Sequence, residues 1–252
     1  MAGLVEKIEI NCDMGEGFGP RRRTHKIHRR SKHRMRIPRR DPSLMLKTVR
    51  MAKAHNVKVG AHPGLFDLFG FGRRRIEVDP EDMYASILYQ VGALKAFLDA
   101  EDVPLNHIKP HGELFFYMQR DAVIMDAVLR AAAVYKVPVY ACKNATQKQM
   151  CAKYGLPFQE ELYVDIDYTP DGALVPVAKS RMATPELIYE RITKCAETDE
   201  RDHNEGGMFK VGFAGTAFSI CLHSDMPTAL ENAKAGRKAV DEANAKLFPE
   251  AK

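Results

Sequence analysis

One strand and the helix that follows it can be recognised in residues 57–98, VKVGAHPGLFDLFGFGRRRIEVDPEDMYASILYQVGALKAFL. Residues 57–62 predict a short strand, because they end at the turn residues Pro63 and Gly64. Asp79 and Pro80 then supply an N-cap and a first-turn proline, which together predict a helix start. The apolar residues of this helix recur with a 3.6-residue period, at Met83, Ile87, Val91, Leu94 and Leu98.

The same alternation of strand and helix extends over the chain in both directions. Further strands are predicted at 7–13, 107–112, 137–142 and 218–223, and further helices begin near 41, 121, 144, 184 and 227. Connections of about 15 to 30 residues between strands require a mostly parallel sheet, open or closed into a barrel. No linker divides the sequence, so we predict an α/β fold in a single domain over residues 1–252.

Composition narrows the class of protein further. The chain has 252 residues, of which 45% are hydrophobic, and this is ample for a large core. No apolar run approaches the roughly 18 residues of a membrane helix, and the first residues carry no secretory signal. The five cysteines are scattered, without a CxxC pair, which argues against a disulfide framework and a zinc knuckle. We therefore expect buried thiols and a cytoplasmic location.

The basic charge of the chain comes from one segment. Residues 21–40, RRRTHKIHRRSKHRMRIPRR, contain nine Arg, two Lys, three His and no acid. The rest of the chain contains 27 basic and 33 acidic residues, so its net charge is −6, whereas the net charge of the whole chain is +5. Dense like charge is typical of a solvated arm or a nucleic-acid patch.

Polar residues of types that take part in catalysis cluster where predicted strands end. They are Asp13 with Glu16, His62, Lys109 with His111, and His223 with Asp225. The carboxyl ends of parallel strands share one face, and that face carries the active site. Carboxylates, imidazoles and a lysine suit metal-assisted or general acid–base hydrolysis. Each residue also has a structural alternative, since a strand-end His is often only hydrogen-bonded and Asp13 could cap a turn.

Several longer motifs, taken in order, resemble the LamB/YcsF family. They are NCDMGEGFG at 11–19, GAHPG at 60–64, FGRR at 71–74, YQVGAL at 89–94, KPHGEL at 109–114 and ICLHSDMP at 220–227. The resemblance implies a distorted TIM-like β/α barrel, as in sugar-processing hydrolases and deacetylases. It also implies the activity of the A subunit of ATP-dependent 5-oxoprolinase, which opens the lactam 5-oxoproline to L-glutamate together with B and C subunits.

The resemblance also suggests roles for residues. Asp13, Glu16 and His62 are candidates for a catalytic base. Asp13 and His62 are also candidates for the ligands of a divalent metal, and Mg²⁺ is the metal expected. Lys109 and His111 would hold the phosphorylated oxygen or the phosphates of ATP. The substrate-binding candidates are Arg73, Asp165, His223 and Asp225. Ile166 stands where the family has an arginine, which bears on specificity.

The family pattern is interrupted at residues 21–40, where members have a second strand ending in a run like NIACGFHAGD. We predict no barrel strand in this Arg-rich segment, and hence an unstable or inactive chain. Three explanations compete: an out-of-frame or misassigned coding segment, an insertion that binds nucleic acid, or a degenerate loop in an inactive member.

Two alternative functions remain open, and two further predictions concern local structure. A metal-dependent deacetylase or amidohydrolase that uses no ATP would need the same Asp and His residues, and a nucleic-acid-binding protein would act through residues 21–40. Residues 197–207 are polar and charged and predict an exposed loop. The resemblance implies a turn at Asp171–Gly172 and a strand that follows it at 174–176.

Overall fold

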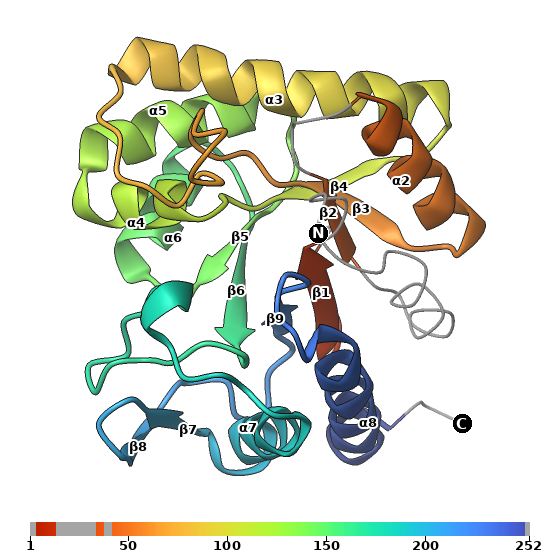
Figure 1. Cartoon of the computed structure of the whole chain (residues 1–252), viewed down its shortest axis with the longest axis vertical. Helices are drawn as coiled ribbons and strands as arrows, with labels where there is room; N and C mark the ends of the chain where they lie inside the picture. The colour runs from red at the N-terminus through yellow and green to blue at the C-terminus, as the bar shows by residue number, and fades with distance from the viewer. Residues whose placement is uncertain (1–3, 14–33, 38–41, 250–252) are drawn as a thin grey trace. The chain divides into compact units, whose positions relative to one another are not determined.

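The computed structural model describes residues 4–13, 34–37 and 42–249, and for 34–37 it describes the backbone (Figure 1). The chain forms two compact units. The first contains Asp13 and the described residues of 34–160, and the second contains residues 5–12 and the described residues from 161 onward. Glu16, and Asp41 as a helix cap, lie outside the described residues.

A parallel sheet of four neighbouring strands forms the centre of the first unit. They are β2 (Arg34–Ile37), β3 (Lys58–Ala61), β4 (Leu105–Ile108) and β5 (Val139–Cys142), paired in that order. The strands predicted near 57, 107 and 137 are confirmed. The register between β3 and β4 shifts between Val59 and Ala61, at the end of β3 that leads into His62.

The described residues of the first unit form five helices. They are α2 (Pro42–Ala54), α3 (Pro80–Ala100), α4 (Glu113–Arg120), α5 (Ala122–Ala133) and α6 (Ala145–Lys153), and α3 lies alongside α5 in Figure 1. Asp79 caps α3 by accepting a hydrogen bond of 2.9 Å from the Glu81 N–H. The sequence did not predict α4, because its N-cap is Gly112, which makes no side-chain cap bond.

The second unit contains a parallel sheet in which β9 (Ser219–Leu222) pairs with both β1 (Glu9–Asp13) and β6 (Phe158–Tyr163). Two long helices, α7 (Pro185–Thr198) and α8 (Ala229–Leu247), pack against each other, and a short 3₁₀ turn, η2, spans Val177–Lys179 (Figure 1). The predicted cap of α7 is confirmed at Thr184. The last helix begins at Ala229 rather than at Pro227.

The absence of a strand from residues 21–40 is the first prediction that the structure corrects. Arg34–Ile37 forms β2, which pairs in parallel with β3, Arg34 opposite Lys58 and Ile37 opposite Ala61. The strand ladder is made by backbone N–H and C=O groups, which every residue of this stretch possesses. An Arg-rich composition therefore lowers the strand propensity of the segment without removing its capacity to pair. Part of the basic segment thus forms a strand.

The second correction concerns residues 197–207, which the sequence predicts as an exposed loop. Helix α7 continues to Thr198, and β7 (Glu200–His203) then forms an antiparallel hairpin with β8 (Gly207–Lys210). Arg201 in β7 is fully buried. The strand predicted after residue 173 is reduced to a single bridge between Tyr168 and Leu174. The local polarity of the sequence led to a wrong prediction here, because the buried arginine bonds to backbone carbonyls that lie far away along the chain.

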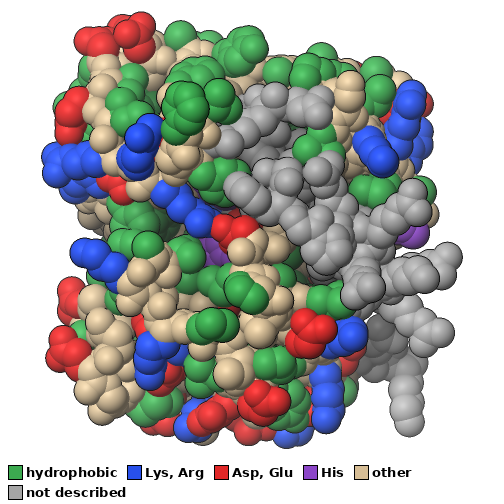
Figure 2. Space-filling view, viewed as in Figure 1, with side chains coloured by type: hydrophobic (Ala, Val, Ile, Leu, Met, Phe, Trp, Pro, Cys, Tyr) green, Lys and Arg blue, Asp and Glu red, His purple; other side chains and the backbone are tan. Residues whose placement is uncertain are grey.

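Other predictions about composition agree with the structure. The apolar residues of α3 are buried, as are all five cysteines. On the face shown in Figure 2, basic and acidic side chains of the described residues are interspersed, in keeping with the prediction that the chain outside residues 21–40 is not basic. Among the described residues, no helix is both long and apolar enough to cross a membrane.

Candidate functional site

The first unit brings together three of the predicted catalytic residues at the ends of strands. Asp13 ends β1, His62 follows β3 directly, and His111 lies three residues after β4. His62 Nε2 lies 3.4 Å from Asp13 Oδ1 and 2.9 Å from His111 Nδ1. All three side chains are buried. The predicted convergence of Asp13, His62 and His111 therefore exists in the structure.

Two backbone carbonyls determine where the protons of this histidine pair, His62 and His111, are held. His62 Nδ1 lies 2.7 Å from the carbonyl oxygen of Lys109, and His111 Nε2 lies 2.7 Å from that of Phe71. A carbonyl only accepts, so each of these nitrogens carries a hydrogen. In two neutral rings the remaining nitrogens would face each other as two lone pairs at 2.9 Å. The geometry therefore assigns one additional proton to the pair.

The Asp13 carboxylate, 3.4 Å from His62 Nε2, places this additional proton on His62. Burial, followed by the positive charge of His62, lowers the pKa of His111 well below its usual range, while Asp13 acts in the opposite direction. His111 is thus neutral and accepts at Nδ1. His62 then donates from both nitrogens, and its positive charge lies beside the Asp13 carboxylate. The arrangement is a buried acid–base relay of carboxylate, imidazolium and imidazole.

The same geometry bears on the metal predicted at Asp13 and His62. Within the described part of the chain, no three His, Cys, Asp or Glu side chains are arranged to hold a metal ion. The facing nitrogens of the histidine pair are at hydrogen-bond distance, which leaves no space for an ion between them. Their donor set is also rich in nitrogen, whereas Mg²⁺ prefers oxygen ligands. The histidine pair in this arrangement therefore offers Mg²⁺ no fitting site, and a metal held by Asp13 and His62 stays a prediction.

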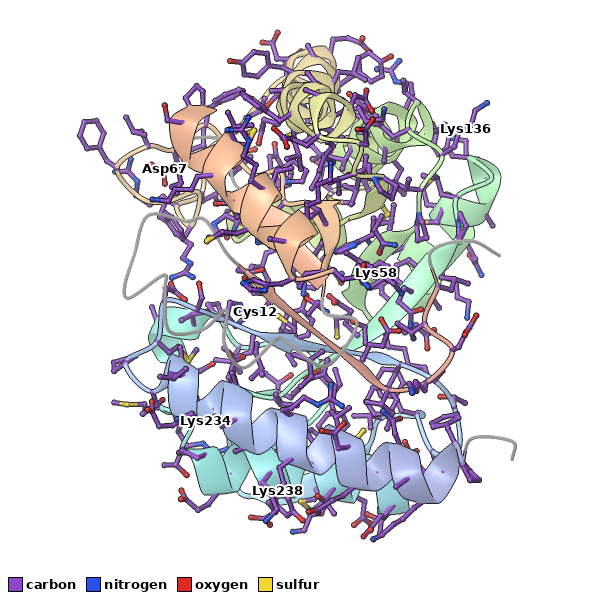
Figure 3. The ribbon with its side chains drawn as sticks, turned by 90° about the vertical axis from the view of Figure 1, so that its right-hand side faces the viewer. Cys12, Lys58, Asp67, Lys136, Lys234 and Lys238 are labelled. Atoms are coloured by element: carbon purple, nitrogen blue, oxygen red, sulfur yellow. The ribbon has the colours of Figure 1, made fainter. Side chains whose placement is uncertain are left out.

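A clamped loop between β3 and α3 supports the histidine pair. Asp67 accepts hydrogen bonds from the Gly70 N–H at 2.8 Å and from the Arg74 guanidinium, whose Nε is 3.0 Å away, and Figure 3 shows Asp67 on this loop. The hydrogen bond from Arg74 lowers the pKa of Asp67 to about 2. Phe71, at a φ of +60°, presents its carbonyl to His111. The clamp thereby fixes the acceptor that sets the His111 tautomer.

Lys109 and Arg73 belong to the same part of the first unit. Lys109 is only 2% exposed, and its carbonyl anchors His62. Arg73 is half-buried, with its guanidinium carbon 5.2 Å from the centre of the Phe71 ring. Both positive side chains thus come from segments that contact the histidine pair.

A second group of predicted residues lies in the second unit. Asp165 accepts hydrogen bonds from the backbone N–H of His223 at 2.5 Å and from its Nδ1 at 2.9 Å. The Asp165 side chain is 1% exposed and that of His223 is 12% exposed. Asp225, half-buried, lies in the turn between β9 and α8. Asp165 therefore fixes the orientation of the His223 ring and the hydrogen on its Nδ1.

An arginine cluster that sequence reasoning missed supports Asp165. It consists of Arg181, Arg191 and Arg201 with Asp167 and Asp202. Arg191 donates to the carbonyl of Val164 at 2.9 Å and Arg201 to that of Ile166 at 2.8 Å. The residue on each side of Asp165 is therefore anchored, through its carbonyl, by a buried guanidinium.

The electrostatics of the arginine cluster favour ionised carboxylates. Burial opposes the ionisation of Asp167, but hydrogen bonds from Arg181 and Arg191 outweigh it and lower the pKa of Asp167 to about 2. In the sequence, Arg191 appears within an amphipathic helix and Arg201 within a polar stretch. Neither position carries a motif that would have marked it.

The fold and the site together define a class of protein. They are those of an α/β protein with buried carboxylate and imidazole groups at the ends of parallel strands. Residues 40–252 match the LamB/YcsF family, and the chain belongs to that family. The match begins at the last residue of the basic segment, in agreement with the interruption noted at 21–40.

Individual relatives extend the match over most of the chain. The lactam utilization protein lamB of Emericella nidulans is 37% identical over 251 residues, which cover 98% of this chain and 99% of that protein. The A subunit of 5-oxoprolinase from Thermus thermophilus is 34% identical, over 96% of this chain and 98% of its own length.

A solved structure confirms the fold class. The crystal structure of the lactam utilization protein of Thermus thermophilus aligns with a TM-score of 0.82 at 34% identity. The alignment covers 94% of this chain and 97% of the Thermus chain. The α/β fold of the distorted TIM-like barrel class, expected from the sequence, is thus confirmed.

Proposed function

We propose that this chain is the lactam-opening subunit of an ATP-dependent 5-oxoprolinase, which converts 5-oxoproline to L-glutamate in the cytoplasm. The observation that carries the proposal is the buried relay of Asp13, His62 and His111. The names of the relatives, which refer to lactam utilization and to 5-oxoprolinase, supply the substrate class. Opening a lactam requires one group that activates water and another that protonates the leaving nitrogen.

The relay has the polarity that this reaction needs. The Asp13 carboxylate can accept a proton from the attacking water, and the His62 imidazolium can donate one to the ring nitrogen as the C–N bond breaks. The proton on Asp13 can return to His62 Nε2, 3.4 Å away, between turnovers, while neutral His111 holds that nitrogen by accepting a hydrogen bond from it. In the step that breaks the C–N bond, the proton taken from water thus balances the proton given to nitrogen.

Phosphorylation of the lactam oxygen by ATP, with release of ADP, would overcome the poor reactivity of an unstrained amide because it makes the carbonyl carbon more electrophilic. Attack by water and cleavage of the C–N bond then leave an acyl phosphate, and a second water converts it to the carboxylate and inorganic phosphate. Lys109, a buried cation, suits the negative charge of the phosphorylated oxygen or of a phosphate. Arg73 suits the carboxylate of the substrate. Asp165, His223 and Asp225 form the further set that we assign to substrate binding.

The second candidate is hydrolysis of an amide or acetyl group without ATP. It is favoured by the same observation, because a carboxylate and imidazoles suffice to activate water for an already reactive carbonyl. The two functions differ in one measurable quantity, which is whether product formation requires ATP.

Several relatives are named as the A subunit of 5-oxoprolinase, and we propose that this chain also works with partner subunits. An exposed apolar surface made of Phe66, Leu68, Phe69 and Tyr89 offers a place for such a contact. Phe69 is 94% exposed, and exposed apolar patches of this kind mark interaction sites. The adjoining clamp of Asp67 and Arg74 holds the loop that carries three of these residues.

The decisive experiment measures glutamate formation from 5-oxoproline by the chain assembled with the B and C subunits of its own organism, with and without ATP. We expect ATP-dependent turnover that falls about 100-fold or more in Asp13→Asn and His62→Asn. His55→Gln, which replaces a histidine just after α2, serves as the control. Full activity of both site variants would overturn the proposed mechanism, and glutamate formation independent of ATP would favour the second candidate.

A further inference from the structure

A buried glutamine on α3 contacts the segment that carries His62. The Gln90 side chain is 5% exposed and projects from the middle of the helix. Its Oε1 accepts a hydrogen bond of 2.9 Å from the Gly64 N–H, and its Nε2 donates one of 3.0 Å to the Gly64 carbonyl. One amide thus satisfies both backbone groups of one residue, in the manner of a strand neighbour.

The two backbone groups of Gly64 fix which way the amide faces, and a third hydrogen bond ties the amide to α3. Gln90 Nε2 also donates to Ser86 Oγ, one turn earlier on α3, at 2.8 Å. With the amide reversed, an oxygen would face the Gly64 carbonyl and an NH₂ would face the Gly64 N–H, so both contacts would be repulsive. The helix therefore holds the peptide at Gly64 in one position.

The other side of this peptide faces the histidine pair. The Pro63 carbonyl accepts a hydrogen bond of 2.7 Å from the His111 N–H. A Cβ added at Gly64 would lie only 3.1 Å from His111 Cβ and Cδ2. Residues 62–64 are thus held between Gln90 on one side and His111 on the other. A shift of this segment away from α3 would push it into the His111 ring.

We propose that Gln90 is a positioning residue for the histidine pair, acting through the Pro63–Gly64 peptide rather than by touching substrate. The inference deepens the proposed function, on which its kinetic part rests. Buried amide groups cost free energy unless they are paired, so an unpaired Gly64 N–H and carbonyl would drive the loop to rearrange. A displacement of about 1 Å in a catalytic group is enough to cost on the order of 100-fold in rate.

The test compares Gln90→Met with a matched control, Gln147→Met. Both replace a buried helical glutamine of the first unit by an apolar side chain of similar length, but Gln147 lies on α6 and bonds to Gln119. Ser86→Ala is the second control, since it removes only the third hydrogen bond of Gln90. The readouts are the imidazole ¹⁵N resonances of the full chain and the kcat and KM of the assembled enzyme.

We expect Gln90→Met to shift the ¹⁵N resonances of His62 and His111 and to lower kcat at least tenfold, with KM changed less than threefold. Gln147→Met and Ser86→Ala should leave the resonances in place and kcat within threefold. Unshifted resonances with a wild-type kcat in Gln90→Met would overturn the proposal, and so would equal effects in Gln147→Met.

This design distinguishes a failure of the proposed function from a failure of the proposed role of Gln90. If the wild-type chain forms no glutamate from 5-oxoproline, the proposed function fails, and the ¹⁵N resonances alone decide the role of Gln90. If Gln90→Met does not fold, Gln90→Asn replaces it, because its amide is one methylene too short to pair with Gly64. In that variant the same resonance shifts support the proposal and unshifted resonances overturn it.

Discussion

The histidine pair of the first unit and the Asp165–His223 group of the second unit are held in place by different kinds of contact. Backbone carbonyls hold the histidine pair, and the neutral side chain of Gln90 holds the neighbouring Gly64. Three guanidinium groups and two carboxylates hold the segment around Asp165. In both cases buried side chains make hydrogen bonds to backbone carbonyls, as burial favours.

The difference teaches how a fold sets protonation. Neutral acceptors fix the tautomers of the histidine pair while burial keeps His111 uncharged, so a proton can be held between two rings. Charged donors do the opposite in the arginine cluster, where they keep Asp167 ionised despite its burial. The first arrangement suits proton transfer and the second suits rigid support. The following predictions test this contrast.

The largest effect is expected from removing one charge of the arginine cluster. Arg191→Met leaves the buried Asp167 and the half-buried Asp202 with fewer partners and also removes the hydrogen bond to the Val164 carbonyl. Breaking a buried ion pair in this way costs about 3 to 5 kcal/mol in the free energy of unfolding. Urea denaturation followed by circular dichroism measures it.

Arg181→Met is the matched control for this variant. Arg181 also bonds to Asp167, but 51% of its side chain is exposed, so we expect a loss of about 1 kcal/mol or less. Equal losses in the two variants would show that burial does not set the strength of the arginine cluster.

A smaller effect is expected where the histidine pair is packed most tightly. Gly64→Ala places a methyl group 3.1 Å from His111, which must move by a few tenths of an ångström. Overpacking of this kind costs about 1 to 3 kcal/mol, and it should also shift the ¹⁵N resonances of His111. Gly206→Ala is the control, because its Cβ would meet nothing within 4 Å and the cost is confined to a φ of +84°. Unshifted His111 resonances in Gly64→Ala would contradict the described packing.

The smallest effect concerns pH. The pKa of His111 is lowered in the folded state, so the unfolded chain binds more protons at this residue below its ordinary value near 6.5. Stability contributed by neutral His111 is therefore complete above about pH 7.5 and falls as the pH drops through 6.5, by up to about 1.4 kcal/mol per pH unit.

Comparing the free energy of unfolding at pH 7.5 and 5.5 tests this expectation. The decrease should be smaller in His111→Gln than in the wild type, and unchanged in His55→Gln. A decrease in His111→Gln as large as that of the wild type would show that His111 does not contribute to the pH dependence.

The predicted strands and helices agree with the structure where a signal is local. Asp79–Pro80 and Thr184–Pro185 mark helix starts because capping involves only neighbouring residues. The position of His62 after β3 followed from the strand that precedes it. Helix α4 was missed because Gly112 gives no such start signal. The strand at Arg34–Ile37 was excluded wrongly, because pairing uses backbone atoms that composition does not describe.

What the sequence alone determined about this protein is therefore its α/β class, its family and the strand ends at which Asp13, His62, His111 and His223 lie. Only the tertiary structure decided the partners of these residues. Gln90 is 26 positions from Gly64, and Arg201 is 35 positions from Ile166. Local pattern records propensity and periodicity, whereas the pairing of a buried polar group depends on which distant atoms the fold places within hydrogen-bond distance.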